Sequence, residues 1–400
     1  MQALILPEHV LKMINTIIFR FLWKKQYSNR RAYEKVKRDV LCLDYRKGGL
    51  KMINIFDMQF SFVVKWFKLI YMKRSALFSQ IPLSLLEILG TDFSVLKSSV
   101  TSKEFKGLGL ISSQFWRQAL KIWLDYNLSD EQPDGNFYDQ PIWNNTLIRY
   151  KHDVLYWNNW CSQFTHVADL FLDDNFMTLD YVQSVLGKNA TVYFQYYALF
   201  NALPLSWKTP QVDDWVINEP TFCNEKLSQL CTKSIRSNLV KKREKAPHSV
   251  VFWRRKFPDI DIMPYFKILY ESTRETRLKT LQWKLLHNIY PTNILLYKMG
   301  KVDSSNCNYC AVRDYVEHFF CECIVVRQIW QLAEQKIESI CGYHITLSDI
   351  NKLFGVKSID VPSLYAREIN NVILIVKMCI SKFKSGSYHD ICLLLNMSLN

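Results

Sequence analysis

The sequence predicts a mainly α-helical protein of elongated, multi-part architecture. Glycine and proline are both scarce, with 11 and 12 among 400 residues, whereas sheet-rich proteins need many tight turns. Hydrophobic residues make up 49% of the chain and charged residues 22%, which is typical of chains with packed cores. Several segments also carry apolar residues at helical spacing. A chain of this length suits roughly two to four domains.

The first predicted part is a helical segment over residues 1–75. Pro7 followed by Glu8 is typical of a first helical turn. Apolar residues then recur at helical spacing, and we expect this stripe to face a core: Val10, Ile14, Ile17 and Phe21. Gly48-Gly49 marks a sharp turn. After that turn a second core-facing helix is expected, with apolar positions at Phe56, Phe60, Val63, Val64 and Phe67.

The second predicted part, residues 76–212, is a helical connecting domain rich in tryptophan and tyrosine. Its tryptophans could fill a core or stack on nucleic-acid bases: Trp116, Trp123, Trp143, Trp157, Trp160 and Trp207. An acidic break that contains proline and glycine interrupts it at residues 129–135. Residues 213–223 carry few periodic apolar positions, so we expect a linker there.

The third predicted part, residues 213–400, is a basic helical domain. Leu278, Leu281, Leu285 and Ile289 follow the spacing i, i+3, i+7 and i+11, which predicts a helix within residues 274–290. Residues 324–341 and 362–384 are expected to form further helices. Pro362 suits the first turn of the second of these.

Positive charge is concentrated in two runs. The net charge is +14, which favours a polyanionic partner such as nucleic acid or an acidic membrane surface. Residues 20–51 hold eleven Lys or Arg against three acids, and residues 231–256 hold nine against one. A charge run can also be a solvated face only. We expect phosphate contacts from these residues: Lys24, Lys25, Arg30, Arg31, Lys37, Arg38, Lys241, Lys242, Arg243, Arg254 and Arg255.

A tight group of cysteines lies in the third part. Cys307 and Cys310 are two residues apart, and His318 and Cys323 follow at a spacing that suits the next helical turn. Structural zinc takes four nitrogen or sulfur ligands in a tetrahedron, so these four residues are expected to hold one zinc ion. Cys321 could replace Cys323 as the fourth ligand. The expected fold is therefore a helical body with a CCHC zinc knuckle at residues 303–330.

The compartment follows from the cysteines and from the apolar pattern. The chain has 11 cysteines, and clustered cysteines in a reducing compartment bind metal more often than they form disulfides. Residues 1–19 lack the pattern of a signal peptide. No stretch reaches the roughly 18 uncharged apolar residues of a membrane span. We expect an intracellular protein of the nucleus or cytoplasm, or both, without membrane contact.

Several short motifs occur along the chain in a defined order. They are Phe21-Leu22-Trp23-Lys24, Lys47-Gly48-Gly49-Leu50, Pro141-Ile142-Trp143-Asn144, Tyr156-Trp157, Leu203-Pro204, Leu281 to His287, Pro291-Thr292-Asn293, Cys307 to Cys310, and Glu317-His318-Phe319-Phe320. In this order they resemble the thumb end, the connecting region and the zinc-binding region of LINE-type (non-LTR) retrotransposon reverse transcriptases. The resemblance implies binding of RNA and DNA during target-primed reverse transcription, with catalysis located upstream of these regions.

No catalytic centre is expected within the chain. A two-metal polymerase site needs carboxylates from at least two motifs. Phe171-Leu172-Asp173-Asp174 matches the letters of the polymerase motif, but no strand-rich palm pattern precedes it, so we interpret it as a loop with an acidic N-cap before a helix. Asp213-Asp214 lies in the expected linker, and His287 is expected to be a packed core residue. The sequence has no glycine-rich phosphate loop, zinc-protease motif or nucleophile elbow, so no small-molecule substrate is expected.

The favoured hypothesis is therefore a non-catalytic module that binds RNA or single-stranded DNA, or both, and works with a reverse-transcriptase core. Two alternatives stay open. The chain could be a scaffold that only docks a polymerase or another protein, or a decayed element copy without activity. It could also be an enzyme whose Asp173 and Asp174 bind magnesium. Primer extension separates the enzyme from the other two, and charge reversal at Lys241, Lys242 and Arg243 separates binding from scaffolding.

Overall fold

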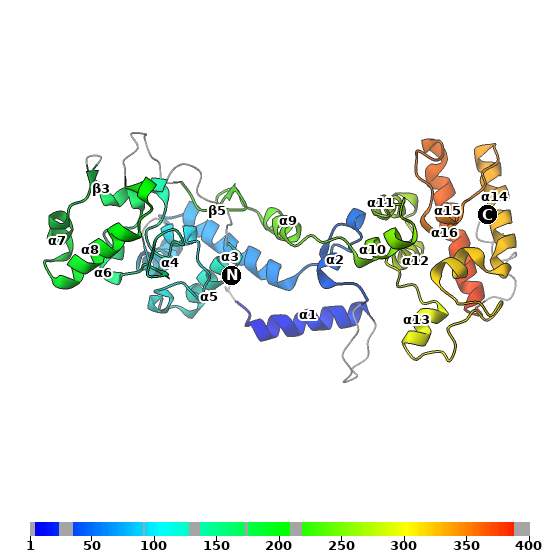
Figure 1. The fold of residues 1–400 in the computed structure, drawn as a ribbon, viewed down its shortest axis with the longest axis horizontal. Coiled ribbons are helices and arrows are strands. Elements are labelled where there is room, and N and C mark those ends of the chain that lie inside the picture. Colours follow the sequence, from blue (N-terminus) through cyan, green and yellow to red (C-terminus); the bar gives the residue numbers. More distant parts are fainter. Residues whose placement is uncertain are drawn as a thin grey trace. The chain divides into compact units, whose positions relative to one another are not determined.

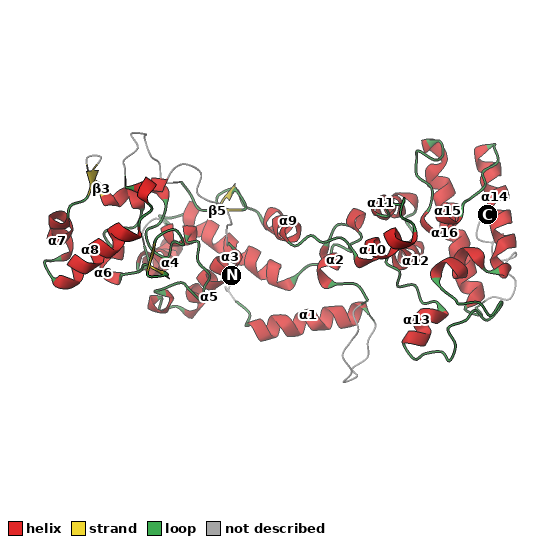
Figure 2. Cartoon of the chain, in the orientation of Figure 1, coloured by secondary structure: helices red, strands yellow, loops and turns green. Residues whose placement is uncertain are grey.

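The computed structural model describes residues 5–23, 35–90, 93–127, 137–172, 175–208 and 218–387. This part of the chain is mainly helical, as the sequence predicts, and its strands form short two-stranded hairpins (Figures 1 and 2). The hairpins are antiparallel: β1 (Arg149–Tyr150) with β2 (Asp153–Val154), β3 (Phe171–Leu172) with β4 (Asn175–Phe176), and β5 (Thr221–Phe222) with β6 (Glu225–Lys226). Among the helices described, none is both long and apolar enough to cross a membrane.

The chain divides into two compact units. Unit 1 consists of residues 1–21 and 54–242, and unit 2 of residues 22–53 and 243–400. This division differs from the three predicted parts at one place in particular, because residues 22–53 group with the C-terminal half and not with the rest of residues 1–75.

Unit 1 contains seven of the longer helices among its described residues. They are α1 (Glu8–Leu22), whose last residue is grouped with unit 2, α3 (Ile55–Met72), α4 (Leu77–Glu87), α5 (Gln114–Tyr126), α7 (Leu179–Leu186), α8 (Ala190–Ala202) and α9 (Thr232–Lys242). Shorter turns connect them: α6 (Asn158–Cys161) and the 3-10 helices η2 (Ser94–Lys97), η3 (Leu108–Leu110), η4 (Phe137–Asp139), η5 (Val167–Leu170) and η6 (Leu205–Trp207).

The first core of unit 1 forms where α3 packs against α5 and α9. Phe60, Val63, Val64 and Phe67 are buried there, as their spacing predicts. The ring of Trp123 on α5 meets Phe67 edge-on, with 5.8 Å between ring centroids.

The apolar stripe of α1 is only partly a core face. The helix begins at Glu8, so Pro7 directly precedes its first turn and is not part of it as we expected, and the helix buries Leu11 and Phe19. Ile17 and Phe21, which we expected in a core, are 50% and 85% exposed. Apolar residues surround much of this helix, so periodicity alone does not select the side that packs.

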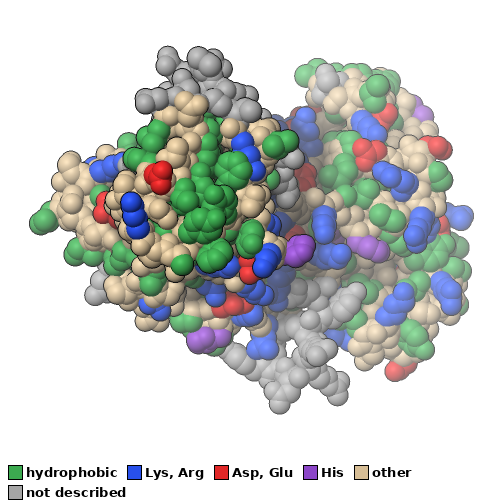
Figure 3. Space-filling view, turned by 60° about the vertical axis from the view of Figure 1, so that its left-hand side comes forward, with side chains coloured by type: hydrophobic (Ala, Val, Ile, Leu, Met, Phe, Trp, Pro, Cys, Tyr) green, Lys and Arg blue, Asp and Glu red, His purple; other side chains and the backbone are tan. Residues whose placement is uncertain are grey.

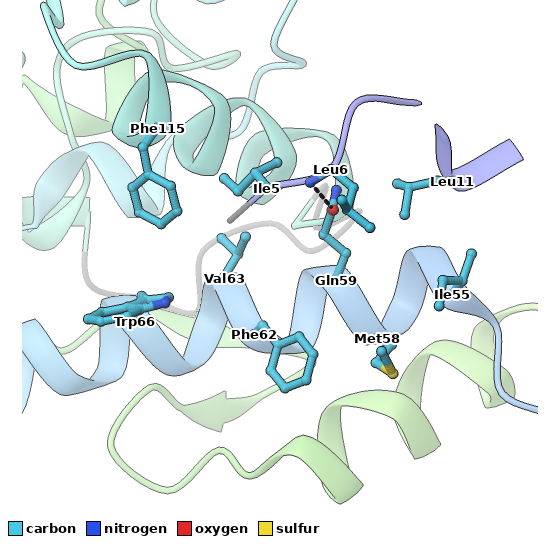
Figure 4. A pocket seen from close by; sticks show the side chains of 10 residues that line it. All are labelled: Ile5, Leu6, Leu11, Ile55, Met58, Gln59, Phe62, Val63, Trp66 and Phe115. Carbon is cyan, nitrogen blue, oxygen red and sulfur yellow. Dashed lines mark hydrogen bonds between the residues drawn. The ribbon is translucent and has the colours of Figure 1, made fainter. Parts of the chain in front are cut away.

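An apolar cavity of about 190 Å³ lies beside α1 and α3 in unit 1 (Figure 4). Ile5, Leu6 and Leu11 line it from the N-terminal side, and α3 contributes Val63 and other apolar residues. The side chain of Gln59 accepts a hydrogen bond from the backbone N–H of Leu6 at 2.8 Å. The other described residues that line the cavity are hydrophobic, so none of them offers a group for acid–base chemistry.

The second core of unit 1 is built around the predicted tryptophan-rich stretch. Trp143, Trp160 and Trp207 are buried in it together with residues of α7 and α8. The indole N–H groups of the first two donate hydrogen bonds, that of Trp143 to Phe164 O at 2.6 Å and that of Trp160 to Gln195 Oε1 at 2.8 Å. These rings therefore fill a core and are not available to stack on bases.

Unit 2 is a helical assembly in which the long helix α16 contacts α11, α12 and α14. Its elements are α2 (Arg38–Cys42), the 3-10 helix η1 (Tyr45–Lys47), α10 (His248–Lys256), α11 (Met263–Ser272), α12 (Thr276–Leu286), α13 (Asn293–Lys298), the π-helix η7 (His318–Glu322), α14 (Ile324–Cys341), α15 (Asp349–Phe354) and α16 (Ser363–Lys384). The predicted helices at residues 274–290, 324–341 and 362–384 correspond to α12, α14 and α16. Pro362 is the N-cap residue of α16 and not part of its first turn, and α12 ends before Ile289.

The Gly48-Gly49 turn explains why residues 22–53 belong to unit 2. Gly48 has a φ of +84°, and its carbonyl oxygen accepts two buried hydrogen bonds. Trp283 Nε1 donates one at 3.0 Å and His287 Nε2 the other at 2.8 Å. Burial lowers the pKa of His287 to about 4, so this imidazole is neutral at pH 7. His287 is thus a packed core residue, as expected, and its hydrogen bond to Gly48 O holds the turn against α12.

A buried lysine connects three helices of unit 2. Lys377 on α16 is fully buried, and its ammonium donates to Gln282 Oε1 at 2.6 Å and to Leu353 O at 2.7 Å. Burial lowers the pKa of Lys377 from 10.5 to about 7. The folded protein therefore gives up this proton at a lower pH than the unfolded chain does.

This pKa shift predicts a pH dependence of stability. Between about pH 7 and 10.5 the unfolded chain binds one more proton at Lys377, so stability rises with pH by roughly 1 kcal/mol per unit and is lost as the pH falls back toward 7. Lys377→Met removes this slope. Urea unfolding of both proteins at pH 7.5 and pH 9.5 gives their free energies of unfolding. We expect the value for the unchanged chain minus the value for Lys377→Met to be larger at pH 9.5 than at pH 7.5. Equal differences at both pH values would contradict the prediction.

Candidate metal centre and basic surface

Cys307 and Cys310 sit in a tight hairpin after α13. The N–H of Cys307 donates to Val312 O at 2.7 Å, and the N–H of Ala311 donates back to Cys307 O at 3.0 Å. Ala311 has a φ of +55°, which allows the chain to reverse directly after Cys310. Two thiols on such a turn point to the same side, which is the arrangement that the spacing of the two cysteines predicts.

His318 and Cys323 are brought together by a π-helical turn. In an α-helix, residues five apart point about 140° away from each other. Here His318–Glu322 forms a π-helix, in which hydrogen bonds span five residues, and the N–H of Cys323 donates to His318 O at 3.0 Å. The wider turn places both side chains on one side, and Cys323 is then the N-cap residue of α14.

The four predicted ligand atoms converge on one point. All of them lie within 4.8 Å of one another. Cys323 Sγ lies 3.7 Å from both Cys307 Sγ and Cys310 Sγ, and Cys310 Sγ lies 3.1 Å from His318 Nε2. A zinc tetrahedron with Zn–S bonds of about 2.3 Å has sulfur–sulfur edges of about 3.8 Å, so the donor set fits one zinc ion. Within the described ranges this is the single cluster of three or more such groups that could hold a metal.

The protonation states also suit a metal. Burial lowers the pKa of His318, which favours the neutral imidazole that ligates zinc. Burial raises the pKa of Cys323 to about 11, so this thiol keeps its proton until a dication displaces it. Metal binding at this cluster is therefore coupled to proton release.

Cys321, the alternative fourth ligand, points elsewhere. Its Sγ lies 3.8 Å from Asp349 O at the start of α15, and burial raises the pKa of this thiol to about 12. The structure therefore places Cys323, and not Cys321, in the cluster.

Neighbouring segments hold the knuckle in place. Asp314 Oδ2 accepts a hydrogen bond from Asn293 N at 3.0 Å, and the amide of Asn293 donates to Asn306 O at 2.7 Å. On the other side, Lys256 Nζ lies 2.5 Å from Glu317 Oε1 and 4.4 Å from the centroid of the Tyr315 ring. Lys256 ends the basic helix α10, so it joins that helix to the residue before the ligand His318.

A family model described as zinc-binding in reverse transcriptase matches residues 241–330 of this chain. The match spans all four ligand residues and the basic helix α10. It supports the interpretation of unit 2 as carrying a zinc region related to that of reverse transcriptases. A search of curated proteins found no match to the chain.

The predicted phosphate-binding residues fall into three groups. Lys24, Lys25, Arg30 and Arg31 lie outside the described residues. Lys241 and Lys242 end α9 in unit 1, and both are exposed. Those in unit 2 are Lys37, Arg38, Arg243, Arg254 and Arg255.

Within unit 2 these cations differ in their surroundings. Arg254 and Arg255 are exposed in the last turn of α10, and no ion pair engages them within the described part of the chain. Lys37 is exposed at the start of α2, whereas Arg38 and Arg243 are half-buried. The one acid of the second run, Glu244, is paired with Lys47 at 2.6 Å and so does not oppose the arginines of α10 directly.

The acidic motif at Asp173-Asp174 lies outside the described residues, as does Asp213-Asp214. The residues on either side of Asp173-Asp174 form the antiparallel pair β3 and β4. We expected a loop with an acidic N-cap, and that expectation is wrong for the cap. The N-cap of α7 is Thr178, whose hydroxyl accepts from Tyr181 N at 3.3 Å.

Proposed function

We propose that this chain is a non-catalytic RNA- or single-stranded-DNA-binding module that acts together with a LINE-type reverse-transcriptase core in target-primed reverse transcription. Zinc would hold the knuckle of unit 2 in shape through Cys307, Cys310, His318 and Cys323. The adjoining basic side chains would neutralise phosphates.

One observation carries the proposal. The exposed pair Arg254 and Arg255 adjoins Lys256, which is bound to Glu317 next to the ligand His318. Among the described residues no ion pair engages either guanidinium group, and helix α10 carries both of them close to the segment that holds His318. Guanidinium groups suit phosphate because their planar donors match its oxygens. The matched zinc region and the net charge of +14 are in line with the same function.

The first test is the salt dependence of binding. We expect the affinity of the zinc-loaded chain for a fluorescent single-stranded oligonucleotide to fall steeply with added salt, because each neutralised phosphate releases condensed counterions. Replacing Arg254 and Arg255 by Gln should lower the slope of log affinity against log salt by roughly 1.4, at about 0.7 per contact for a single strand.

The matched control is the double variant Lys301→Gln/Arg367→Gln, which removes the same charge from two other exposed positions of unit 2. It should leave the slope close to that of the unchanged chain. If both double variants lower the slope of log affinity against log salt by the same amount, net charge alone drives binding and α10 is not the site. The absence of catalysis is tested separately, since we expect no primer extension by the chain with magnesium and nucleotides.

A docking role is the second candidate, and an aromatic surface favours it. On α8, Tyr193 and Tyr197 are each 43% exposed and Phe194 is 70% exposed. In Figure 3 the left-hand side of Figure 1, which belongs to unit 1, is turned toward the viewer. Hydrophobic side chains are gathered on this face of unit 1. Exposed clustered rings are typical of protein interfaces. If Phe194→Ser weakens capture of a reverse-transcriptase core and leaves oligonucleotide binding unchanged, this surface serves docking.

A further inference from the structure

The last turn of α16 packs against the zinc knuckle although it lies beyond residues 241–330. The rings of Tyr309 and Phe383 are stacked, with centroids 5.4 Å apart and planes 22° apart. Tyr290 Oη lies 2.5 Å from Ser381 Oγ. Tyr309 stands between the ligands Cys307 and Cys310, so the end of this helix covers the metal-binding turn itself.

Lys384, at the end of the same turn, directs its charge to the ligands. Its Nζ lies 4.0 Å from Cys307 Sγ, within reach of an N–H···S hydrogen bond, and 4.5 Å from the centroid of the Phe319 ring. Lys384 is half-buried, so solvent screens this charge only in part.

The donor set needs such a charge. Three thiolates and a neutral imidazole around one dication leave one net negative charge. The cluster is largely buried, where an uncompensated charge is costly. A cation that donates to a ligand sulfur offsets that charge and fixes the sulfur in place, as outer-sphere groups do in other metal sites.

We propose that Lys384 is a positioning residue of the zinc site, and that the complete metal-binding unit therefore extends from the knuckle to the last turn of α16. The inference concerns how firmly zinc is held and does not depend on nucleic-acid binding. It also means that residues 241–330 alone lack part of the site.

The test compares zinc affinities of full-length chains, measured by competition with a chromophoric chelator. We expect Lys384→Met to bind zinc roughly 10- to 100-fold more weakly, the usual effect of losing an outer-sphere partner. Methionine keeps an apolar stem over Phe319, so packing changes little while the charge is lost. Lys384→Arg keeps the charge and a donor and should stay within about threefold of the unchanged chain.

Lys301→Met is the matched control, because it removes one exposed lysine close in sequence to Cys307. It should leave zinc affinity unchanged. A Lys384→Met chain that binds zinc as tightly as the Lys301→Met chain would overturn the proposal. A loss of equal size in Lys384→Arg would also overturn it, because a retained cation should rescue binding.

A second measurement covers the case in which Lys384→Met folds poorly. Hydrogen exchange of the unchanged chain is followed over residues 376–387 with and without a zinc chelator. If the end of α16 is part of the site, chelation should speed exchange there, while exchange over α5 in unit 1 stays constant. Unchanged exchange at the end of α16 would show that this turn is independent of the metal.

Discussion

Zinc content should fall from one ion per chain to none in Cys323→Ala and should stay at one in Cys321→Ala. The two cysteines are two residues apart and both are buried. Only the sulfur of Cys323 lies 3.7 Å from Cys307 and Cys310, whereas that of Cys321 faces the backbone of α15. Each variant therefore removes one buried sulfur atom. The sulfur lost in Cys323→Ala belongs to the cluster, and the one lost in Cys321→Ala does not. Metal analysis of the two purified proteins decides the result.

The same substitution should destabilise unit 2. A metal that binds only the folded state adds about 4 kcal/mol when its free concentration is 1,000 times the dissociation constant. Cys323→Ala forfeits this contribution, whereas Cys321→Ala should cost about 1 kcal/mol as an ordinary small core substitution. Thermal unfolding with and without added zinc measures both. A zinc-dependent rise in melting temperature for Cys323→Ala would show that three ligands suffice, contrary to the prediction.

The spacing of the residues predicts the four ligands of this site, but it does not predict the elements that hold these ligands in place. Two cysteines two residues apart, followed by a histidine and a cysteine, identify four donors because zinc demands that chemistry. Nothing in the residue order announces the π-turn that aligns His318 with Cys323. Lys384 and Phe383 are as far from the knuckle in sequence as many unrelated residues, so only packing reveals their part in it.

The fold follows a similar division between local and long-range causes. The helices α12, α14 and α16 were predicted closely because each has a regular apolar face that is buried in the unit. The same rule failed for Ile17 and Phe21 of α1, where apolar residues lie on several sides and neighbours decide which are covered. The grouping of residues 22–53 with unit 2 was not predictable from the sequence for a related reason. Their attachment to unit 2 depends on bonds from Trp283 and His287 to Gly48, 235 and 239 residues away.

Gly49 lies next to Gly48 in this turn, and Gly49→Ala is the substitution that we expect to lower the stability of unit 2 the most. A Cβ atom at Gly49 would stand 1.9 Å from Leu43 O and 2.7 Å from Leu43 Cα. The contact is with backbone, so no side chain can rotate away to relieve it. The N–H of Lys51 also donates to Leu43 O at 3.0 Å, and displacing that carbonyl breaks this bond. We expect a loss of about 3 kcal/mol or more in the free energy of unfolding of unit 2.

Two other glycines separate this clash from effects of backbone conformation. Gly342 in unit 2 has a φ of +77° and open space around it, so Gly342→Ala should cost only the strain of that conformation, about 1 kcal/mol. Gly109 in unit 1 has open space and no positive φ, so Gly109→Ala should be nearly neutral. Urea unfolding measures all three, and the transition of unit 2 is identified by its shift on zinc removal. If Gly49→Ala costs no more than Gly342→Ala, the turn adjusts freely, and the anchoring of residues 22–53 at Gly48 is weaker than its two buried hydrogen bonds imply.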